Sequence, residues 1–136
     1  MKKRLLYTML MLLFRCSPVA AHMPEQSMNG LIQNIHSSIN ALDTKEISTF
    51  FDNTVEFTYI NTHSTLTRGH ALLILNDFYE KHKPKSFKVD YTGSTPLGDG
   101  RYILGSALTE SGTFKLYFYV KERSGKFFIE ELKIVK

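Results

Sequence analysis

The sequence predicts an α+β fold in which a strongly curved antiparallel β-sheet carries three helices on its concave face. Apolar residues recur every three or four positions in two early segments, and again in a third segment that follows a strand. The last third of the chain instead alternates apolar and polar residues in three segments joined by short turns. The closing segment KFFIEELKIVK changes the phase of that alternation halfway, which indicates a bent strand. Helices followed by a run of strands pack on one face of an antiparallel meander.

The N-terminal segment has the three parts of a secretory signal peptide. A basic start, Lys2–Arg4, precedes the short apolar run of residues 5–14. Small residues at Val19 and Ala21 then suit cleavage after Ala21. We therefore expect export to the periplasm or the exterior.

Two alternatives to a cleaved signal peptide conflict with Arg15. A membrane span would need about 20 apolar residues, and Arg15 interrupts the apolar run too early. A lipoprotein would be acylated at Cys16, but the residue before such a cysteine is small, and arginine is neither small nor neutral. The expected organisation is a signal peptide over 1–21 and one domain over 22–136, with no membrane span after cleavage.

Charge and cysteine content exclude some classes of function for this domain. Four of the 17 Lys and Arg residues and none of the 13 Asp and Glu residues lie in the first 21 positions, which leaves 13 of each sign in the domain. Nucleic-acid binding needs a persistent positive field, so no nucleic-acid partner is expected. Cys16 is the only cysteine, so the domain has neither a disulfide nor a thiolate nucleophile.

Three helices are predicted before the strand-rich half. The first spans about residues 26–42, and Asp43 or Thr44 caps a short second helix. The third covers 70–82 and ends just before Pro84. Their apolar faces contain Met28, Leu31, Ile32, Ile35, Ile39 and Leu42 in the first helix, Ile47, Phe50 and Phe51 in the second, and Leu72, Leu75, Phe78, Tyr79 and His82 in the third.

The strands are predicted from alternation. VEFTYI places Val55, Phe57 and Tyr59 on one side, and NTHSTLTRG is a polar loop that can hold a short strand. SFKVDYT is a second strand, with its apolar side formed by Phe87, Val89 and Tyr91. Three further strands lie near residues 101–110, 113–122 and 127–135.

Two hairpins define the face of the sheet that meets the helices. Ser111-Gly112 and Ser124-Gly125 are predicted as two-residue turns, and the register follows by counting outward from them. Large residues on one strand then face small residues on its neighbour, which leaves room for a helix or a pocket. The predicted concave face consists of Ile103, Gly105, Ala107, Thr109, Phe114, Leu116, Phe118, Val120, Ile129, Leu132 and Ile134.

The phase change in the last strand is interpreted as a β-bulge. An unbroken ladder beyond Ile129 would point Glu131 and Lys133 into the core, and burying an unpaired charge costs several kcal/mol. One extra residue at Glu130-Glu131 returns Leu132 to the core face. The alternative is a strand that ends near Glu130.

Several blocks together resemble a known family. The helix pair, VEFTYI, LILNDFYEKHKPKSFKV and ESGTFKLYFYVKERSGKFFIEELKI are similar to a group of small exported bacterial proteins of uncharacterised function. Their fold is of the nuclear transport factor 2-like type, a cystatin-like α+β cone. The resemblance covers about residues 26–135 and implies such a cone over 22–136. Because that superfamily contains isomerases, dehydratases, hydrolases and inactive domains, it supports fold more than function.

The sequence leaves two functions open. No predicted concave residue of the last three strands is titratable, so the first is a non-catalytic cone that binds a small apolar ligand or a partner. The second is an isomerase, dehydratase or hydrolase acting on an apolar substrate, which would use Tyr59 with His36 or Glu56. No catalytic residue, cofactor or metal site is assigned. The candidate pocket residues are His36, Phe57, Tyr59, Phe78, Phe118 and Leu132.

The opposite face of the sheet is the candidate interface. It combines Tyr102, Leu104, Tyr117 and Tyr119, where a solvated face would carry Thr, Lys and Glu. Contiguous apolar patches usually mark contact surfaces, and tyrosine suits them because it buries area and keeps a polar tip. We expect a homodimer or an external partner here. The alternative is a solvent-exposed surface formed by tyrosine rings and the aliphatic parts of lysine side chains, with no partner bound.

Overall fold

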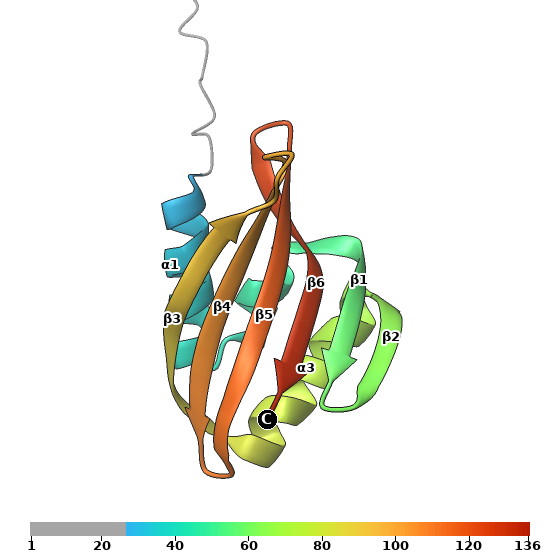
Figure 1. Cartoon of the computed structure of the whole chain (residues 1–136). Coiled ribbons are helices and arrows are strands. Elements are labelled where there is room, and N and C mark those ends of the chain that lie inside the picture. The colour runs from blue at the N-terminus through green and yellow to red at the C-terminus, as the bar shows by residue number, and fades with distance from the viewer. Residues whose placement is uncertain (1–26) are drawn as a thin grey trace, which may run out of the picture.

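The computed structural model describes residues 27–136, so the predicted signal peptide, its cleavage site and Cys16 lie outside the described residues. One six-stranded, curved and unclosed sheet carries three helices on one face (Figure 1). The predicted α+β class is confirmed. The elements are α1 (Met28–Asn40), α2 (Thr44–Ser48), β1 (Phe51–Tyr59), β2 (Thr62–Thr67), α3 (Arg68–His82), β3 (Pro84–Ser94), β4 (Gly100–Thr109), β5 (Gly112–Arg123) and β6 (Lys126–Val135).

The strand order is β2-β1-β6-β5-β4-β3, which differs in one pairing from the antiparallel sheet predicted. β1 and β6 run parallel, and the other neighbours are antiparallel. β1 precedes α3 in the chain, and β6, the last strand, pairs with the edge of β1 opposite to β2. The two hairpins that join β4, β5 and β6 leave β6 parallel to β4, and β1 runs in the same direction as both.

Each helix begins at a side-chain cap. The Ser27 hydroxyl accepts from the backbone N–H of Gly30 at 3.0 Å, and the Asp43 carboxylate accepts from that of Glu46 at 2.9 Å. Thr67 caps α3 in the same way. These bonds satisfy N–H groups that have no partner within the first helical turn.

The predicted end of the second helix and the predicted start of the first strand are wrong. The second helix stops at Ser48, and Phe51, predicted on it, is the first residue of β1 opposite Ile129. The backbone N–H of Ile129 donates to the carbonyl of Phe50 at 2.7 Å, so strand pairing overrides the helical pattern here. The polar segment after β1 does contain a strand, β2, which lies at the edge of the sheet.

The β5–β6 hairpin confirms the predicted turn and bulge. Ser124 and Gly125 have φ of 51° and 76°, as a type I′ turn requires. Val120 lies opposite Ile129 and Tyr119 opposite Glu131, so Glu130 is the extra residue. Beyond the bulge, Phe118 pairs with Leu132 and Leu116 with Ile134, as predicted.

The β4–β5 turn lies one residue earlier than predicted. Thr109 pairs with Gly112, so Glu110 and Ser111 form the loop, and Gly112 follows it with a φ of 111°. The Thr109 hydroxyl accepts from the N–H of Ser111 and donates to the carbonyl of Gly112 at 2.7 Å. Moving the turn by one residue shifts the partner of each β4 residue by two positions along β5. Because side chains alternate with a period of two, each side chain keeps its predicted face.

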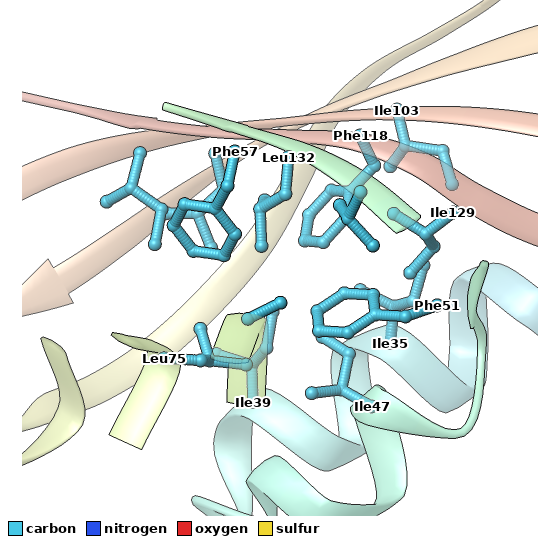
Figure 2. Packing of buried hydrophobic residues seen from close by; sticks show 14 of the residues in the cluster. Ile35, Ile39, Ile47, Phe51, Phe57, Leu75, Ile103, Phe118, Ile129 and Leu132 are labelled. Carbon is cyan, nitrogen blue, oxygen red and sulfur yellow. The ribbon is translucent and has the colours of Figure 1, made fainter. Parts of the chain in front are cut away.

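The core fills the concave side of the sheet. The predicted concave residues of β4, β5 and β6 are all buried. Side chains from the helices, among them Ile35, Ile39 and Leu75, meet Phe118 and Leu132 from the sheet (Figure 2).

Gly105 does not leave an open space in this core. A Cβ atom on Gly105 would lie 2.2 Å from Cζ of Phe87. Phe87 is only 2% exposed and packs edge-on against Phe118, with ring centroids 6.4 Å apart. The room left by the small residue is therefore filled by an aromatic ring from β3.

Tyr91 does not share the apolar face of β3 with Phe87 and Val89, as alternation predicted. Val89 pairs with Gly105 but Tyr91 pairs with Leu104, so Asp90 is an extra residue. The bulge turns Tyr91 to the convex face, where it is 63% exposed.

Candidate functional site

The convex face of the sheet carries a contiguous group of aromatic and aliphatic side chains. Tyr102 lies opposite Tyr119 and Leu104 opposite Tyr117, and the β3 bulge adds Tyr91 beside Leu104. We call these five residues the tyrosine face. Tyr102 and Tyr117 are exposed, and Leu104 and Tyr119 are half-buried. The four residues predicted for the interface are thus brought together, and Tyr91 is a member that alternation had placed on the wrong side.

Packing within the tyrosine face orders its rings. Tyr102 and Tyr119 have ring centroids 5.2 Å apart. The Tyr119 ring covers Gly100, where an added Cβ would lie 2.5 Å from the phenol oxygen. Burial raises the pKa of Tyr119, and the nearby Asp99 carboxylate adds to the effect. The face therefore presents uncharged rings that are already held in place.

Paired charges surround the tyrosine face. The Lys115 ammonium lies 3.4 Å from Asp90, and Lys133 lies 2.7 Å from Glu131. A hydrogen bond from Ser106 is the main reason that the pKa of Asp90 is lowered. The rim consequently has both signs in neighbouring pairs, with no block of one sign.

Four of the six candidate pocket residues lie in the packed core. Phe57, Phe78, Phe118 and Leu132 are each no more than 1% exposed. Phe78 also packs edge-on against Phe114 at 5.1 Å between centroids. A ligand would reach these side chains only after the core had opened.

His36 lies on the outer side of α1, outside the cone. It lines a shallow hollow of about 360 Å³ between α1 and β3, together with Ile32, Gln33, Ser37 and Val89. Its Nε2 is 3.2 Å from the side-chain nitrogen of Asn40. His36 and Tyr59, suggested together for an enzyme, are therefore not brought together.

Tyr59 is paired instead with His82. The phenol oxygen lies 3.2 Å from Nε2 of the imidazole, and the His82 ring packs at a tilt of 51° against Phe114 with centroids 4.6 Å apart. Nδ1 of His82 is buried and has no hydrogen-bond partner among the described residues. Burial raises the pKa of Tyr59, and Asp77 raises it further, so the phenol keeps its proton at neutral pH. Sequence reasoning missed this pair, although His82 lies on the apolar side of its helix.

Glu56, the third residue considered for an enzyme, points away from the core. Its carboxylate lies 2.9 Å from Nε2 of His63 and accepts from the Thr65 hydroxyl at 2.7 Å. The concave face assigned to Val55 and Phe57 is therefore correct.

Comparison with known proteins gives the family. The profile of the domain of unknown function DUF4783 matches residues 32–135. The chain belongs to the DUF4783 family. This agrees with the resemblance to an uncharacterised family inferred from the sequence. No curated protein sequence matches the chain.

Solved structures of DUF4783 proteins share the fold. One from Bacteroides fragilis YCH46 is 20% identical with a TM-score of 0.70, and covers 76% of this chain and 95% of its own. One from Bacteroides ovatus ATCC 8483 is 17% identical with a TM-score of 0.70, covering 76% and 92%. An uncharacterised protein with a cystatin-like fold from Caulobacter vibrioides is 12% identical, with a TM-score of 0.57 and coverage of 79% and 87%. The nuclear transport factor 2-like cone is confirmed.

Two features of this DUF4783 domain bear on metals and membranes. Within residues 27–136, no three His, Cys, Asp or Glu side chains are grouped so that they could hold a metal ion. None of the helices in the same range has the length and apolar character needed to cross a membrane.

Proposed function

We propose that the protein is an exported, non-catalytic binding domain that forms a homodimer through the tyrosine face. The observation that carries this proposal is the contiguous set of rings and Leu104 across three strands of the convex face. Exposed apolar patches of this kind usually mark an interface. Tyrosine is enriched in interfaces because it buries a large area at low entropic cost.

The charges around the face favour a second copy of the chain as the occupant. A two-fold axis brings each patch against itself, so a self-complementary rim must contain both signs. Lys115 and Lys133 lie beside Asp90 and Glu131, which meets that condition. A strongly acidic or basic partner would find no block of opposite charge to bind.

The interior supports a binding role over catalysis. General acid–base catalysis inside a cone needs a titratable group that a substrate can reach. The concave side chains of β4, β5 and β6 are apolar or hydroxyl-bearing, and the hydroxyl of Thr109 is used within its own turn. The core side chains stabilise the sheet that presents the rings.

Sedimentation equilibrium tests the homodimer. We expect the wild-type exported protein to dimerise at micromolar concentration, and the Tyr102→Glu plus Tyr117→Glu variant to remain monomeric. Both tyrosines are more than 40% exposed, so the variant should keep its circular dichroism spectrum. The matched control, Gln33→Glu plus Asn34→Glu, adds the same charge at exposed positions of α1 and should dimerise like the wild type.

Two outcomes would overturn the homodimer. A wild-type protein that stays monomeric at high micromolar concentration would leave only an external partner for this face. A dimer that survives both glutamates would place the contact elsewhere.

A second candidate function is acid–base chemistry at the Tyr59–His82 pair. It is favoured by the hydrogen bond between these side chains and by the unpartnered, buried Nδ1 of His82. Native mass spectrometry of protein exported from its own cells would reveal a retained small molecule. Retention that is lost in Tyr59→Phe would support this function, whereas an empty protein whose stability rises in His82→Phe would show a purely structural pair.

A further inference from the structure

A shallow hollow of about 390 Å³ lies where the sheet is least regular, and it is separate from the tyrosine face. β1 pairs with β6 at Phe51 and Ile129 and resumes only at Glu56 and Glu131. Four residues of β1 therefore stand opposite the single bulge residue of β6, which spreads the two strands. The hollow is lined by Asp52, Asn53, Arg68, Arg123, Ser124, Lys126 and Phe128.

The lining holds three cations and one carboxylate. Arg123 already neutralises Asp52, since their side chains are 2.8 Å apart. Burial would raise the pKa of Asp52, but the hydrogen bonds from Arg123 and from the backbone of Asn53 outweigh it, and the pKa is lowered. Among the described residues, Lys126 has no ion-pair partner, and no carboxylate pairs with Arg68. With three cations and one carboxylate the lining has a net positive charge, although the Asp52 carboxylate also acts on Arg68 electrostatically.

Two of the three cations are held in fixed orientations. The Nε of Arg68 donates to the carbonyl of Phe51 at 3.1 Å, which orients the guanidinium plane. Its terminal nitrogens have no hydrogen-bond or ion-pair partner within residues 27–136. Arg123 is fixed by Asp52 and by the Phe128 ring, whose centroid lies 4.5 Å from the guanidinium carbon. A fixed guanidinium loses little entropy when it binds an oxyanion.

The backbone adds a field of the same sign. Arg68 is the first residue of α3, a helix of 15 residues, and no acidic residue occupies its first turn. The partial positive charge at a helix N-terminus therefore adds to the charges of Arg68 and Lys126.

We propose that this hollow binds an oxyanion, the carboxylate or phosphate group of a small ligand, between Arg68 and Lys126 beside the fixed Asp52–Arg123 ion pair. Guanidinium and ammonium groups form their strongest hydrogen bonds with such oxygens. The Asp52 carboxylate is engaged by Arg123, and the three cations outnumber this single carboxylate, so the lining stays positive overall. The irregular β1–β6 pairing thus provides a place for a ligand.

Titration by NMR tests the site, with inorganic phosphate and acetate as separate probes at constant ionic strength. We expect saturable shifts of the amides of residues 52–53, 68–70 and 123–128. If only phosphate binds, the group that the natural ligand places here is a phosphate. If acetate binds, that group is a carboxylate. Lys126→Gln should weaken binding by about tenfold, because one of the charge-assisted hydrogen bonds is lost. Arg68→Gln should weaken it by at least as much.

The controls separate binding from folding and from general charge. Lys126 is exposed and unpaired, so Lys126→Gln should leave the amide spectrum of the free protein unchanged beyond its neighbours. Lys85→Gln removes one charge from an exposed lysine of β3 that forms no ion pair among the described residues, and it should not alter the affinity. The absence of saturable shifts with either anion, or an equal loss of affinity in the control, would overturn the proposal.

Discussion

Substitution of Gly105 tests whether the cone is filled. In Gly105→Ala the new methyl group would lie 2.2 Å from Cζ of Phe87 and 2.9 Å from the carbonyl oxygen of Lys88. The ring is held by Phe118 and the carbonyl belongs to the backbone, so neither retreats easily. Overpacking of cores typically costs 1–3 kcal/mol, and this contact belongs at the upper end, about 3 kcal/mol. Chemical denaturation measures the loss directly.

Controls make the result specific to this contact. Gly69→Ala has no atom within 4 Å of its new methyl group, and within a helix it should be neutral or stabilising by up to about 1 kcal/mol. Phe87→Leu removes the clashing ring atoms, so the double variant Gly105→Ala plus Phe87→Leu should lose about 1–2 kcal/mol less than the sum of the single losses. Strictly additive losses would show that the ring does not occupy this space, and an open pocket above Gly105 would then be the better interpretation.

Three further predictions concern the core, pH and processing. Phe118→Ala should cost about 3–5 kcal/mol, as large-to-small core changes do, while Lys115→Ala should cost little; similar losses on denaturation would show that the faces are misassigned. Because the folded-state pKa of Asp52 is lowered, its ion pair with Arg123 stabilises the fold above the carboxyl's unfolded pKa, and this contribution is lost as the pH falls through the folded value. Thermal melts of Asp52→Asn should therefore converge on wild type at acidic pH, and a constant gap would contradict the shift. N-terminal sequencing of exported protein should begin after Ala21, and a chain that starts at Met1 would exclude the signal peptide.

The faces of the last three strands could be predicted because charge leaves few choices. Glu131 and Lys133 cannot point into an apolar core, and this restriction alone required an extra residue in β6. For Gly112, the same reasoning did not give the exact position of the turn. Its positive φ suits the second position of a turn and equally the residue that follows one, so only the faces, and not the loop, followed from the sequence.

Other features depend on contacts between distant residues. The segment that contains Tyr91 alternates without a flaw, yet Asp90, which accepts hydrogen bonds from Ser106 of β4 and Lys115 of β5, is skipped in the pairing with β4, so that Tyr91 pairs with Leu104. The Tyr59–His82 pair joins a strand end to a helix end 23 positions away. No local pattern contains either contact, so both candidate sites were incomplete before the fold was known.

The bulge in β6 has a consequence for changes in chain length. Removing Glu130 would leave Ile129 opposite Val120 and would bring Glu131 into a regular ladder opposite Tyr119, so that each core side chain kept its face. Removing Lys133 instead would turn the following isoleucine toward solvent. Within this strand, the order of apolar and polar residues specifies which side is buried, and the number of residues specifies how far the sheet bends. Loss of a single codon at position 130 would thus flatten the sheet while its interior stayed covered, and shape could diverge among such proteins without loss of the core.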